Sequence, residues 1–413
     1  MGFNRWQLAA GLILLLASCR QEPTDPTPHL KWYVFDEPSG AFDEAAKRCS
    51  ALAQGAFRVE TVALPASADQ QREQLVRRLA AGDRDIDIIG MDVIWTAEFA
   101  QAGWILPWTG ERGKAAQQGR LASTTQSAFY RGTLWAVPFT TNAQLLWYRR
   151  DRVAAVPQSW DAMINLAEAI GEGGTIQVQG ERYEGLTVLF VSLLASAGGS
   201  VLDQTGQTVS LETRATQEAL ELMGRLARSA ATDPMLSTSR EDEGRLAFEG
   251  GGSAFMVNYT FVWPSARRHA PQVARHMGWS RWPMVKEDQP SRVVIGGINL
   301  GIGAHSRHPQ QAFQAALCIA SENNQRLAAA KGGLPPTLEA LYDDPRVREV
   351  FPFADVLRAT LRDGVQRPQS PVYTDISLAI SRTLHPMRDI DPQRDVSRLR
   401  AVVGRALKSE GLF

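Results

Sequence analysis

The chain has 413 residues, more than one hydrophobic core usually supports, so two lobes are expected. Lysine and arginine together number 44, as do aspartate and glutamate, and this balance argues against nucleic acid or an anionic lipid surface as the partner. The six histidines and three cysteines show no metal-ligand spacing, so we expect neither a zinc site nor a cofactor.

The N-terminus has the three-part layout of a secretory signal: Arg5, an apolar run from 8 to 16, and small residues directly before Cys19. The run is much shorter than the roughly 20 residues of a bilayer-spanning helix, and no later segment is apolar for long enough. The residues Leu-Ala-Ser-Cys at 16–19 resemble the lipobox of bacterial lipoproteins, which implies cleavage after residue 18 and acylation of Cys19. The alternative is an ordinary signal peptide whose cleavage site happens to precede a cysteine.

The region after the signal peptide (1–18) is rich in proline and has almost nothing to bury, so 19–29 should be a flexible tether and ordered structure should begin near Leu30. We therefore expect an extracytoplasmic protein anchored to the cell membrane by lipid on Cys19. In a bacterium with two membranes it would face the periplasm.

The first ordered part of the chain alternates between two patterns. Strand-like runs at 30–35, 57–64 and 85–90 are separated by amphipathic helix patterns at about 41–54 and 70–81. This order predicts a parallel sheet with helices on its faces.

Later segments change in character. Residues 135–148 have the pattern of two apolar strands that meet at a proline and polar residues, as in a crossing between lobes. A helix should follow, capped by Ser159 or Asp161. A strand at 293–302 is interrupted by a glycine pair, and the last third of the chain is helical.

Two cysteines, Cys49 and Cys318, fall in helix-like stretches. A disulfide can persist outside the cytoplasm, but sequence separation says nothing about the short Cα distance that it needs. The sequence supports two buried, unbonded thiols at least as well as a disulfide.

Four blocks in chain order carry a family resemblance. They are DIIGMDVIWTAEFAQAGW at 87–104, the crossing and helix start at 135–161, FEGGGSAFMVNYTFVWP at 248–264, and VQRPQSPVY at 365–373. Together they resemble the extracytoplasmic solute-binding proteins of ABC sugar importers, in particular family 1 proteins of the maltose- and trehalose-binding type.

The resemblance implies an α/β, two-lobe periplasmic-binding-protein fold of class II type. Each lobe would be a mostly parallel sheet flanked by helices, and a hinge would let the lobes close around the ligand. One lobe would comprise 30–138 and 296–347, and the other 142–292 and 350–413.

The resemblance also assigns ligand contacts. Asp92 follows a buried strand at the sheet end where ligands of open α/β sheets bind, and is implied to bind sugar; a helix cap or surface turn is the alternative. Asn142 at the crossing is implied to bind sugar or, alternatively, to satisfy a turn. Arg367 is implied to bind hydroxyls, unless it is a solvated surface residue.

Other residues have weaker support. Gly297 permits close backbone approach to a ligand, but a strand-bulge glycine would look the same. Relatives carry acidic and basic ligand residues near Asp36, Glu37 and Arg72. For stacking on a sugar ring, strand alternation would place Tyr259, Phe261 and Trp263 on one face. Many relatives have tryptophan at the position of Tyr259.

These residue types suit a neutral sugar, because carboxylates and amides bond adjacent hydroxyls and aromatic rings cover the C–H faces. We expect capture of a trehalose- or maltose-like disaccharide or small oligosaccharide by a monomer, delivery to ABC permease subunits, and no enzymatic activity. The alternatives are another polar solute such as a glycerophosphodiester, which would need more cations than Arg72 and Arg367, or a lipid-anchored glycosidase using Asp92 and Glu37. A third alternative is a structural or chemosensory lipoprotein that has this fold but serves no transporter.

Overall fold

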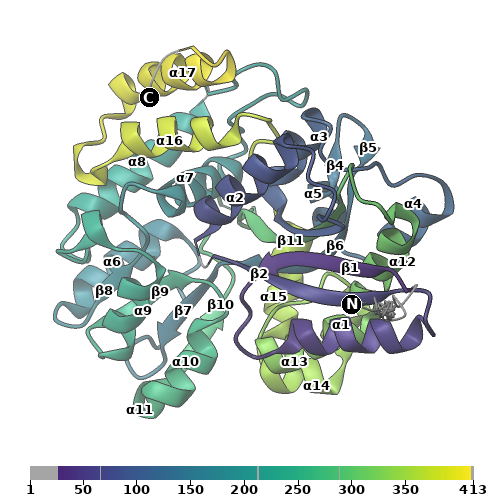
Figure 1. Ribbon diagram of the computed structural model, residues 1–413. Helices are drawn as coiled ribbons and strands as arrows, with labels where there is room; N and C mark the ends of the chain where they lie inside the picture. The colour runs from purple at the N-terminus through teal and green to yellow at the C-terminus, as the bar shows by residue number, and fades with distance from the viewer. Residues whose placement is uncertain (1–26, 66, 212–213, 288, 411–413) are drawn as a thin grey trace, which may run out of the picture.

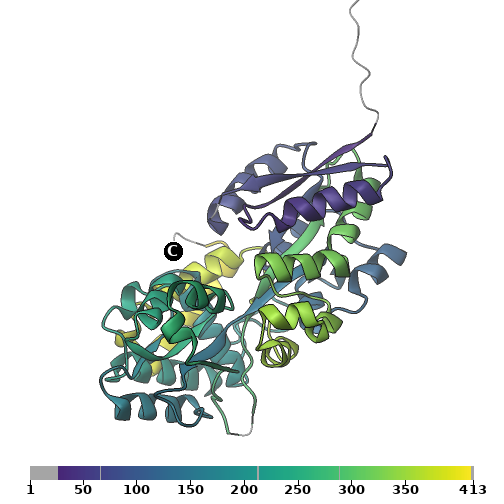
Figure 2. The ribbon, with the colours of Figure 1, turned by 90° about the horizontal axis from the view of Figure 1, so that it is seen from below.

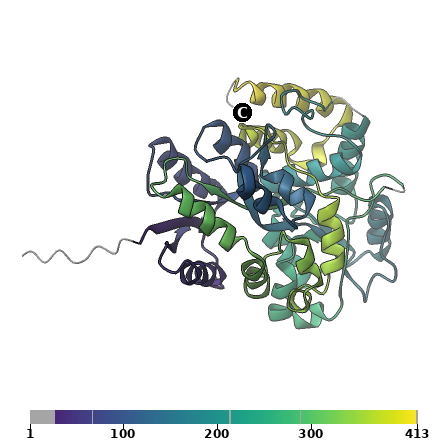
Figure 3. The same ribbon diagram turned by 90° about the vertical axis from the view of Figure 1, so that its right-hand side faces the viewer.

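The computed structural model describes residues 27–410 except 66, 212–213 and 288. The predicted signal peptide, Cys19 and most of the tether lie outside these residues. Within the described part, regular structure begins at β1 (His29–Phe35), and no helix has the length and apolar character needed to cross a membrane. The chain forms two lobes, each with its own sheet (Figures 1, 2 and 3).

The N-terminal lobe is built on a five-stranded sheet in the order β2-β1-β3-β11-β6. Besides β1, its strands are β2 (Arg58–Leu64), β3 (Ile88–Asp92), β6 (Ala136–Ala143) and β11 (Ile295–Ile302). The elements that accompany this sheet are α1 (Ala41–Leu52), α2 (Ala68–Ala80), η1 (Val93–Trp95), α3 (Thr96–Gln101), α4 (Gly110–Gln117), α5 (Ala122–Ser127), the hairpin β4 (Phe129–Tyr130) and β5 (Thr133–Leu134), α12 (Pro309–Ile319) and α13 (Glu322–Gly332).

The C-terminal lobe is built on a four-stranded sheet in the order β10-β7-β9-β8. Its strands are β7 (Leu145–Arg149), β8 (Thr175–Gln177), β9 (Ser253–Asn258) and β10 (Met277–Ser280). Its helical elements are α6 (Trp160–Ile170), α7 (Glu184–Ser196), α8 (Arg214–Arg228), η2 (Leu236–Thr238), α9 (Glu241–Glu249), α10 (Val262–His269), α11 (Pro271–Ala274), α16 (Tyr373–Leu384), η4 (Met387–Asp389) and α17 (Pro392–Leu407).

The remaining helical elements, η3 (Glu339–Asp343), α14 (Pro345–Val350) and α15 (Ala354–Arg362), lie beside the crossing between the lobes. Helix α15 contacts β6 and α5, and Phe353 at its start packs against Trp147 of β7 with 5.1 Å between ring centroids. This segment therefore touches both lobes where the chain passes between them.

The two-lobe α/β architecture is confirmed, but the sheets are mixed rather than mostly parallel. In the N-terminal lobe β1 pairs in parallel with β2 and β3, as the β-α-β-α-β order predicts, whereas β11 is antiparallel to both β3 and β6. In the C-terminal lobe only β8 and β9 are parallel. The difference arises because β11 enters the first sheet from the other lobe, and not through a helical crossover.

Two hydrophobic clusters support the lobes. In the first, Ile88, Ile89 and Met91 of β3 are completely buried, as expected for a strand covered on both faces. In the second, Phe255 of β9 and Trp147 of β7 are likewise buried. The predicted crossing at 135–148 differs in detail, because β6 continues through Pro138 as far as Ala143 before β7 begins. The predicted cap of α6 is Ser159, whose Oγ accepts a hydrogen bond from the Ala162 amide at 3.1 Å.

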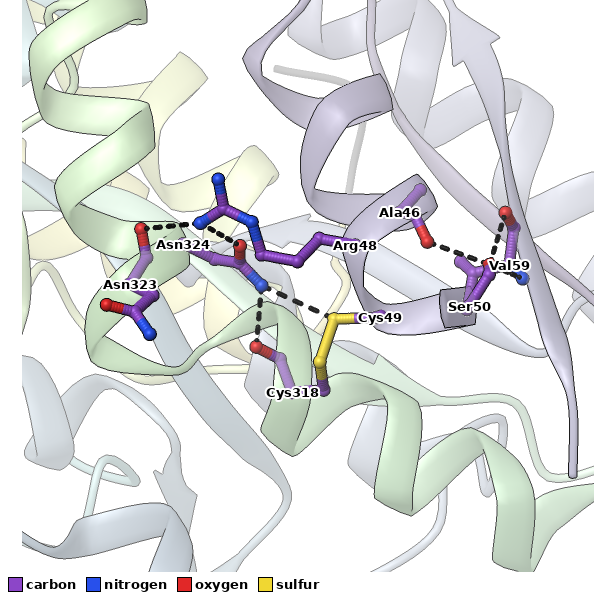
Figure 4. Close-up of a disulfide and its surroundings, with 8 residues drawn as sticks. All are labelled: Ala46, Arg48, Cys49, Ser50, Val59, Cys318, Asn323 and Asn324. Carbon is purple, nitrogen blue, oxygen red and sulfur yellow. Dashed lines mark hydrogen bonds between the residues drawn. A yellow bond between two sulfur atoms is a disulfide. The ribbon is translucent and has the colours of Figure 1, made fainter. Parts of the chain in front are cut away.

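The cysteines left open by the sequence form a disulfide. Cys49 of α1 and Cys318 of α12 are bonded, with 5.8 Å between their Cα atoms (Figure 4). Beside the bond, Asn324 Nδ2 donates to the Cys318 carbonyl at 2.8 Å, and Arg48 reaches the Asn323 carbonyl at 3.4 Å. The bond joins two helices of the N-terminal lobe that are distant in sequence.

Candidate functional site

Asp92 is the last residue of β3, and its carboxylate is hydrogen-bonded to groups outside the sheet. Its Oδ1 accepts the Ile94 amide at 3.1 Å, which caps η1, and also accepts from Arg367 Nη2 at 3.1 Å. Its Oδ2 accepts no hydrogen bond from the described residues. The capping role raised as an alternative is therefore present, and it leaves one oxygen for another partner.

Arg367 lies in the segment between α15 and α16 and is only 9% exposed. Its Nη1 donates to Glu184 Oε1 at 3.0 Å, and its Nε is buried without a partner among the described residues. Burial alone would lower the pKa of Arg367, but the adjacent carboxylates of Asp92 and Glu184 outweigh it and raise the pKa above its usual value. A solvated surface arginine, the alternative, is thereby excluded.

Glu184 begins α7 and was not identified from the sequence. Its Oε1 accepts from Tyr373 Oη at 2.5 Å as well as from Arg367, and its Oε2 accepts from Ser377 Oγ. The first turn of a helix favours a carboxylate, and a buried arginine requires one. These two preferences could have pointed to Glu184 from the sequence, but neither distinguishes it from the other acidic residues of the chain.

Tyr259 directly follows β9 and lies near the same charges. Burial and then the nearby Glu241 raise the pKa of the Tyr259 phenol, and Arg367, Glu184 and Asp92 also act on it electrostatically. Close by, Tyr183 Oη donates to Glu241 Oε2 at 2.6 Å. An aromatic ring thus borders the charged groups, which we call the Asp92–Arg367–Glu184 cluster.

The predicted alternation of Tyr259, Phe261 and Trp263 along one strand is wrong. Strand β9 ends at Asn258, a turn follows, and α10 begins at 262. Phe261 is 39% exposed, and Trp263 packs edge-to-face on Trp279 with 5.3 Å between centroids. The three rings therefore do not share a strand face.

Gly297 and Asn142 lie on neighbouring strands at the crossing. Gly297 has a φ of 136°, and a Cβ there would stand 2.2 Å from the Thr140 carbonyl oxygen, next to a register irregularity between β11 and β6. The bulge interpretation alone therefore accounts for this glycine. The half-buried Asn142 side chain lies over Gly296, where a Cβ would be 2.4 Å from its Oδ1, and it makes no hydrogen bond to the described residues.

The other predicted residues have local partners. Glu37 accepts the amides of Ser39 and Ala41, both at 2.9 Å, at the start of α1. Asp36 is exposed. Arg72 of α2 makes a two-bond pair with Glu98 of α3, with Nε to Oε2 at 2.7 Å. None of the three residues is hydrogen-bonded to the Asp92–Arg367–Glu184 cluster.

A cavity of about 790 Å³ adjoins the cluster. Of the predicted ligand residues only Arg367 borders it. Its lining consists of Gln126, residues 129–132, Val191, Ala195, residues 199–206, Arg292 and residues 365–369. Within the described part of the chain, no group of three or more histidine, cysteine, aspartate or glutamate side chains is arranged to hold a metal ion.

Comparison with known proteins places these features in a family context. The model of the bacterial extracellular solute-binding protein family matches residues 42–326. A probable ABC transporter-binding protein of Deinococcus radiodurans is 25% identical over 372 residues, 86% of this chain and 87% of that protein.

Solved structures resemble the fold over nearly the whole chain. Maltose-bound MalE3 of T. maritima has a TM-score of 0.79 at 26% identity, covering 93% of this chain and 100% of that one. The GacH receptor of Streptomyces glaucescens, known unliganded and with acarbose, has a TM-score of 0.78 at 19% identity, with 93% and 100% covered. A cyclo/maltodextrin-binding protein with maltotetraose has a TM-score of 0.79 at 14% identity, with 95% and 100% covered.

Proposed function

The chain belongs to the bacterial extracellular solute-binding proteins, and from this premise we propose that it captures a disaccharide or small oligosaccharide between its lobes and delivers it to an ABC importer. Proteins of this family bind solutes outside the cytoplasm, so the chain is extracytoplasmic. Trehalose and maltose are the proposed ligands, in keeping with the maltose bound to MalE3 of T. maritima.

The observation that carries the proposal is the half-occupied carboxylate of Asp92 beside a buried arginine at the end of β3. Its Oδ1 is held by Ile94 and Arg367, whereas Oδ2 is available to accept from a sugar hydroxyl. A hydrogen bond to an ionised carboxylate is about twice as strong as a neutral one. With Tyr259 nearby for ring contact and Asn142 at the crossing, the set of groups suits a neutral polyol.

Charge at the Asp92–Arg367–Glu184 cluster argues against a phosphodiester beside Asp92. Arg367 is the cation of the cluster, and Asp92 and Glu184 already neutralise it, with Glu241 close by. An anionic phosphate placed beside Asp92 would meet excess negative charge, which costs free energy in a partly desolvated site.

We assign the ligand contacts to Asp92, Arg367, Tyr259 and Asn142. Glu37, Arg72, Gly297 and Trp263 have partners or packing roles that need no ligand. We further propose that the lobes move about the crossing at 138–142 and that the chain acts as a monomer without catalytic activity.

The proposed lipid anchor is separate from the site. Acylation of Cys19 would keep the receptor close to its permease at high effective concentration. Radiolabelled fatty acid supplied to expressing cells should enter the wild-type chain and not C19S, and labelling of both or neither would contradict the proposal.

Isothermal titration calorimetry with trehalose, maltose, sucrose and maltotriose tests the ligand. At least one should bind with saturating heat, and glycerophosphocholine should not. Binding of glycerophosphocholine alone would replace the sugar by the rival solute. Chromatography of each sugar after incubation tests for turnover, since release of monosaccharides would identify a glycosidase.

A further inference from the structure

Glu184 and Asp92 belong to different lobes, yet both bind one guanidinium group. Asp92 ends β3 of the N-terminal lobe, and Glu184 begins α7 of the C-terminal lobe. Arg367 Nη2 donates to the first at 3.1 Å and Nη1 to the second at 3.0 Å. The Asp92–Arg367–Glu184 cluster therefore spans the boundary between the lobes. Figure 1 shows α7 and α16 next to each other in the C-terminal lobe.

Glu184 is the best-fixed member of the cluster. Its two oxygens accept from Tyr373 Oη, Ser377 Oγ and Arg367 Nη1, so each oxygen is used. Two of these donors come from a single helix, α16, which packs against α7. The carboxylate consequently has one orientation, set by the packing of the C-terminal lobe.

The fixed orientation of the Glu184 carboxylate also fixes the orientation of the Arg367 guanidinium. A guanidinium is planar and its donors form a rigid fork, so an Nη1 bond to a fixed carboxylate determines where Nη2 and Nε point. The backbone near Arg367 is fixed as well. The Val365 amide donates to the Val293 carbonyl at 2.9 Å, and the Val365 carbonyl accepts from the Ile295 amide at 3.0 Å. Because Nε is buried without a partner among the described residues, the head group is restrained by the two Nη contacts and by the Tyr373 ring, whose centroid lies 5.9 Å from the guanidinium carbon.

We propose that Glu184 is a positioning residue for the sugar site, holding Arg367 so that Asp92 keeps its Oδ2 free for the ligand. The proposal rests on the sugar-binding function above. Without the charge of Glu184, Arg367 would be balanced by Asp92 alone and would turn toward it, competing with the ligand for that carboxylate. Glu184 thus acts on ligand affinity through Arg367 and does not itself touch the sugar.

The variant E184Q removes the charge while keeping the shape, and E181Q is the matched control. Glu181 lies three residues earlier and, like Glu184, forms an ion pair with an arginine: its Oε2 lies 2.5 Å from Arg240 Nε. With maltose or trehalose as the probe, E184Q should weaken binding about tenfold, and E181Q should stay within twofold of the wild type.

A double-mutant cycle separates positioning from a general structural effect. If Glu184 acts through Arg367, E184Q should cause no further loss of affinity in an R367M background, because the group that it positions is absent. Equal losses in both backgrounds, or unchanged affinity in E184Q, would overturn the proposal while leaving sugar binding intact.

A ligand-independent readout covers the case in which the wild type binds none of the four sugars, which would refute the proposed function. NMR of the arginine side chains reports the Nε–H signal of Arg367, identified by its absence in R367M. This proton should exchange slowly in the wild type and in E181Q, and at least about tenfold faster in E184Q. Equal exchange in all three proteins would refute positioning by Glu184.

Discussion

At the scale of single residues, Asp92 combines a structural and a proposed functional role on different atoms. One oxygen caps η1 and binds Arg367, and the other has no partner among the described residues. Removal of the whole side chain would confuse the two roles. An asparagine keeps an oxygen for the cap, at nearly the same capping free energy, while it removes the charge.

We therefore predict that D92N lowers affinity for maltose or trehalose at least tenfold, about 1.4 kcal/mol, while the protein still unfolds cooperatively because Glu184 continues to balance Arg367. Asp83 provides the control because it has the same kinds of partner as Asp92. Its carboxylate accepts a hydrogen bond from the amide of Asp85, two residues later, at 2.9 Å, and it also pairs with Arg78. D83N should bind like the wild type. Calorimetry and thermal unfolding of both variants check this, and equal affinity in D92N would remove Asp92 from the site.

At this scale, the sequence can single out a residue that follows a recognisable element, although the ligand role of that residue stays a prediction. Asp92 was predicted because it ends a buried strand, and Arg367 because of its motif. Glu184 was missed because its pairing with Arg367 joins positions 183 residues apart, and no local pattern encodes such a contact. Glu37 was expected near the ligand, but its acidic character serves the start of α1.

At the scale of elements, the junction of β6 and β11 depends on a glycine. Gly297 adopts a φ of 136°, which side-chain-bearing residues rarely do, and the Thr140 carbonyl occupies the position of a Cβ. The strands between the lobes therefore approach each other more closely than larger residues would permit.

We predict that G297A lowers the free energy of unfolding by at least about 2 kcal/mol, from backbone strain together with the steric clash. Gly103, after α3, is the comparison, since its φ is also positive, at 70°, but nothing lies within 4 Å of its Cβ position. G103A should cost only about 1 kcal/mol. Urea unfolding of the two variants measures the difference, and similar costs would mean that the strands adjust freely.

The sequence predicted β1, β2, β3 and the helices between them well, because alternating patterns specify both type and order. It failed at the end of β9, where hydrophobic alternation suggested a continued strand. Pro264 in the first turn of α10 favoured a helix start, and this signal outweighs alternation. The direction of β11 was not predictable, since it depends on how the chain returns from the other lobe.

At the scale of the whole molecule, the Cys49–Cys318 disulfide closes a loop with a sequence separation of 269. Long loops restrict the unfolded chain most, so the bond should stabilise the fold. We predict that the double variant C49A/C318A loses about 2–4 kcal/mol of unfolding free energy while affinity for the sugar is retained. Chemical unfolding and calorimetry of the same samples check both statements, and unchanged stability would contradict the first.

Buried phenols should make the fold sensitive to alkali. Tyr342 and Tyr373 are 0% and 3% exposed, and burial raises the pKa of both phenols well above 10.0. Above pH 10 the unfolded chain loses these protons while the folded chain keeps them, so stability is full below that pH and falls as pH rises.

The expected slope is up to about 1.4 kcal/mol per pH unit for each tyrosine. Urea unfolding of the wild type and Y342F between pH 9 and 11 should show a shallower decline in the variant, since the comparison cancels the other titrating groups. Parallel declines would show that Tyr342 ionises equally in both states.

The disulfide has a further consequence for how the chain can be cut. Both cysteines belong to the N-terminal lobe, but the chain between them passes through the second lobe, including β7 to β10, before it returns. A protease that nicks any loop of that excursion would produce two fragments that remain covalently joined. The receptor would migrate as one species until reduced, so a single backbone break need not release the half that holds Asp92 from the half that holds Arg367.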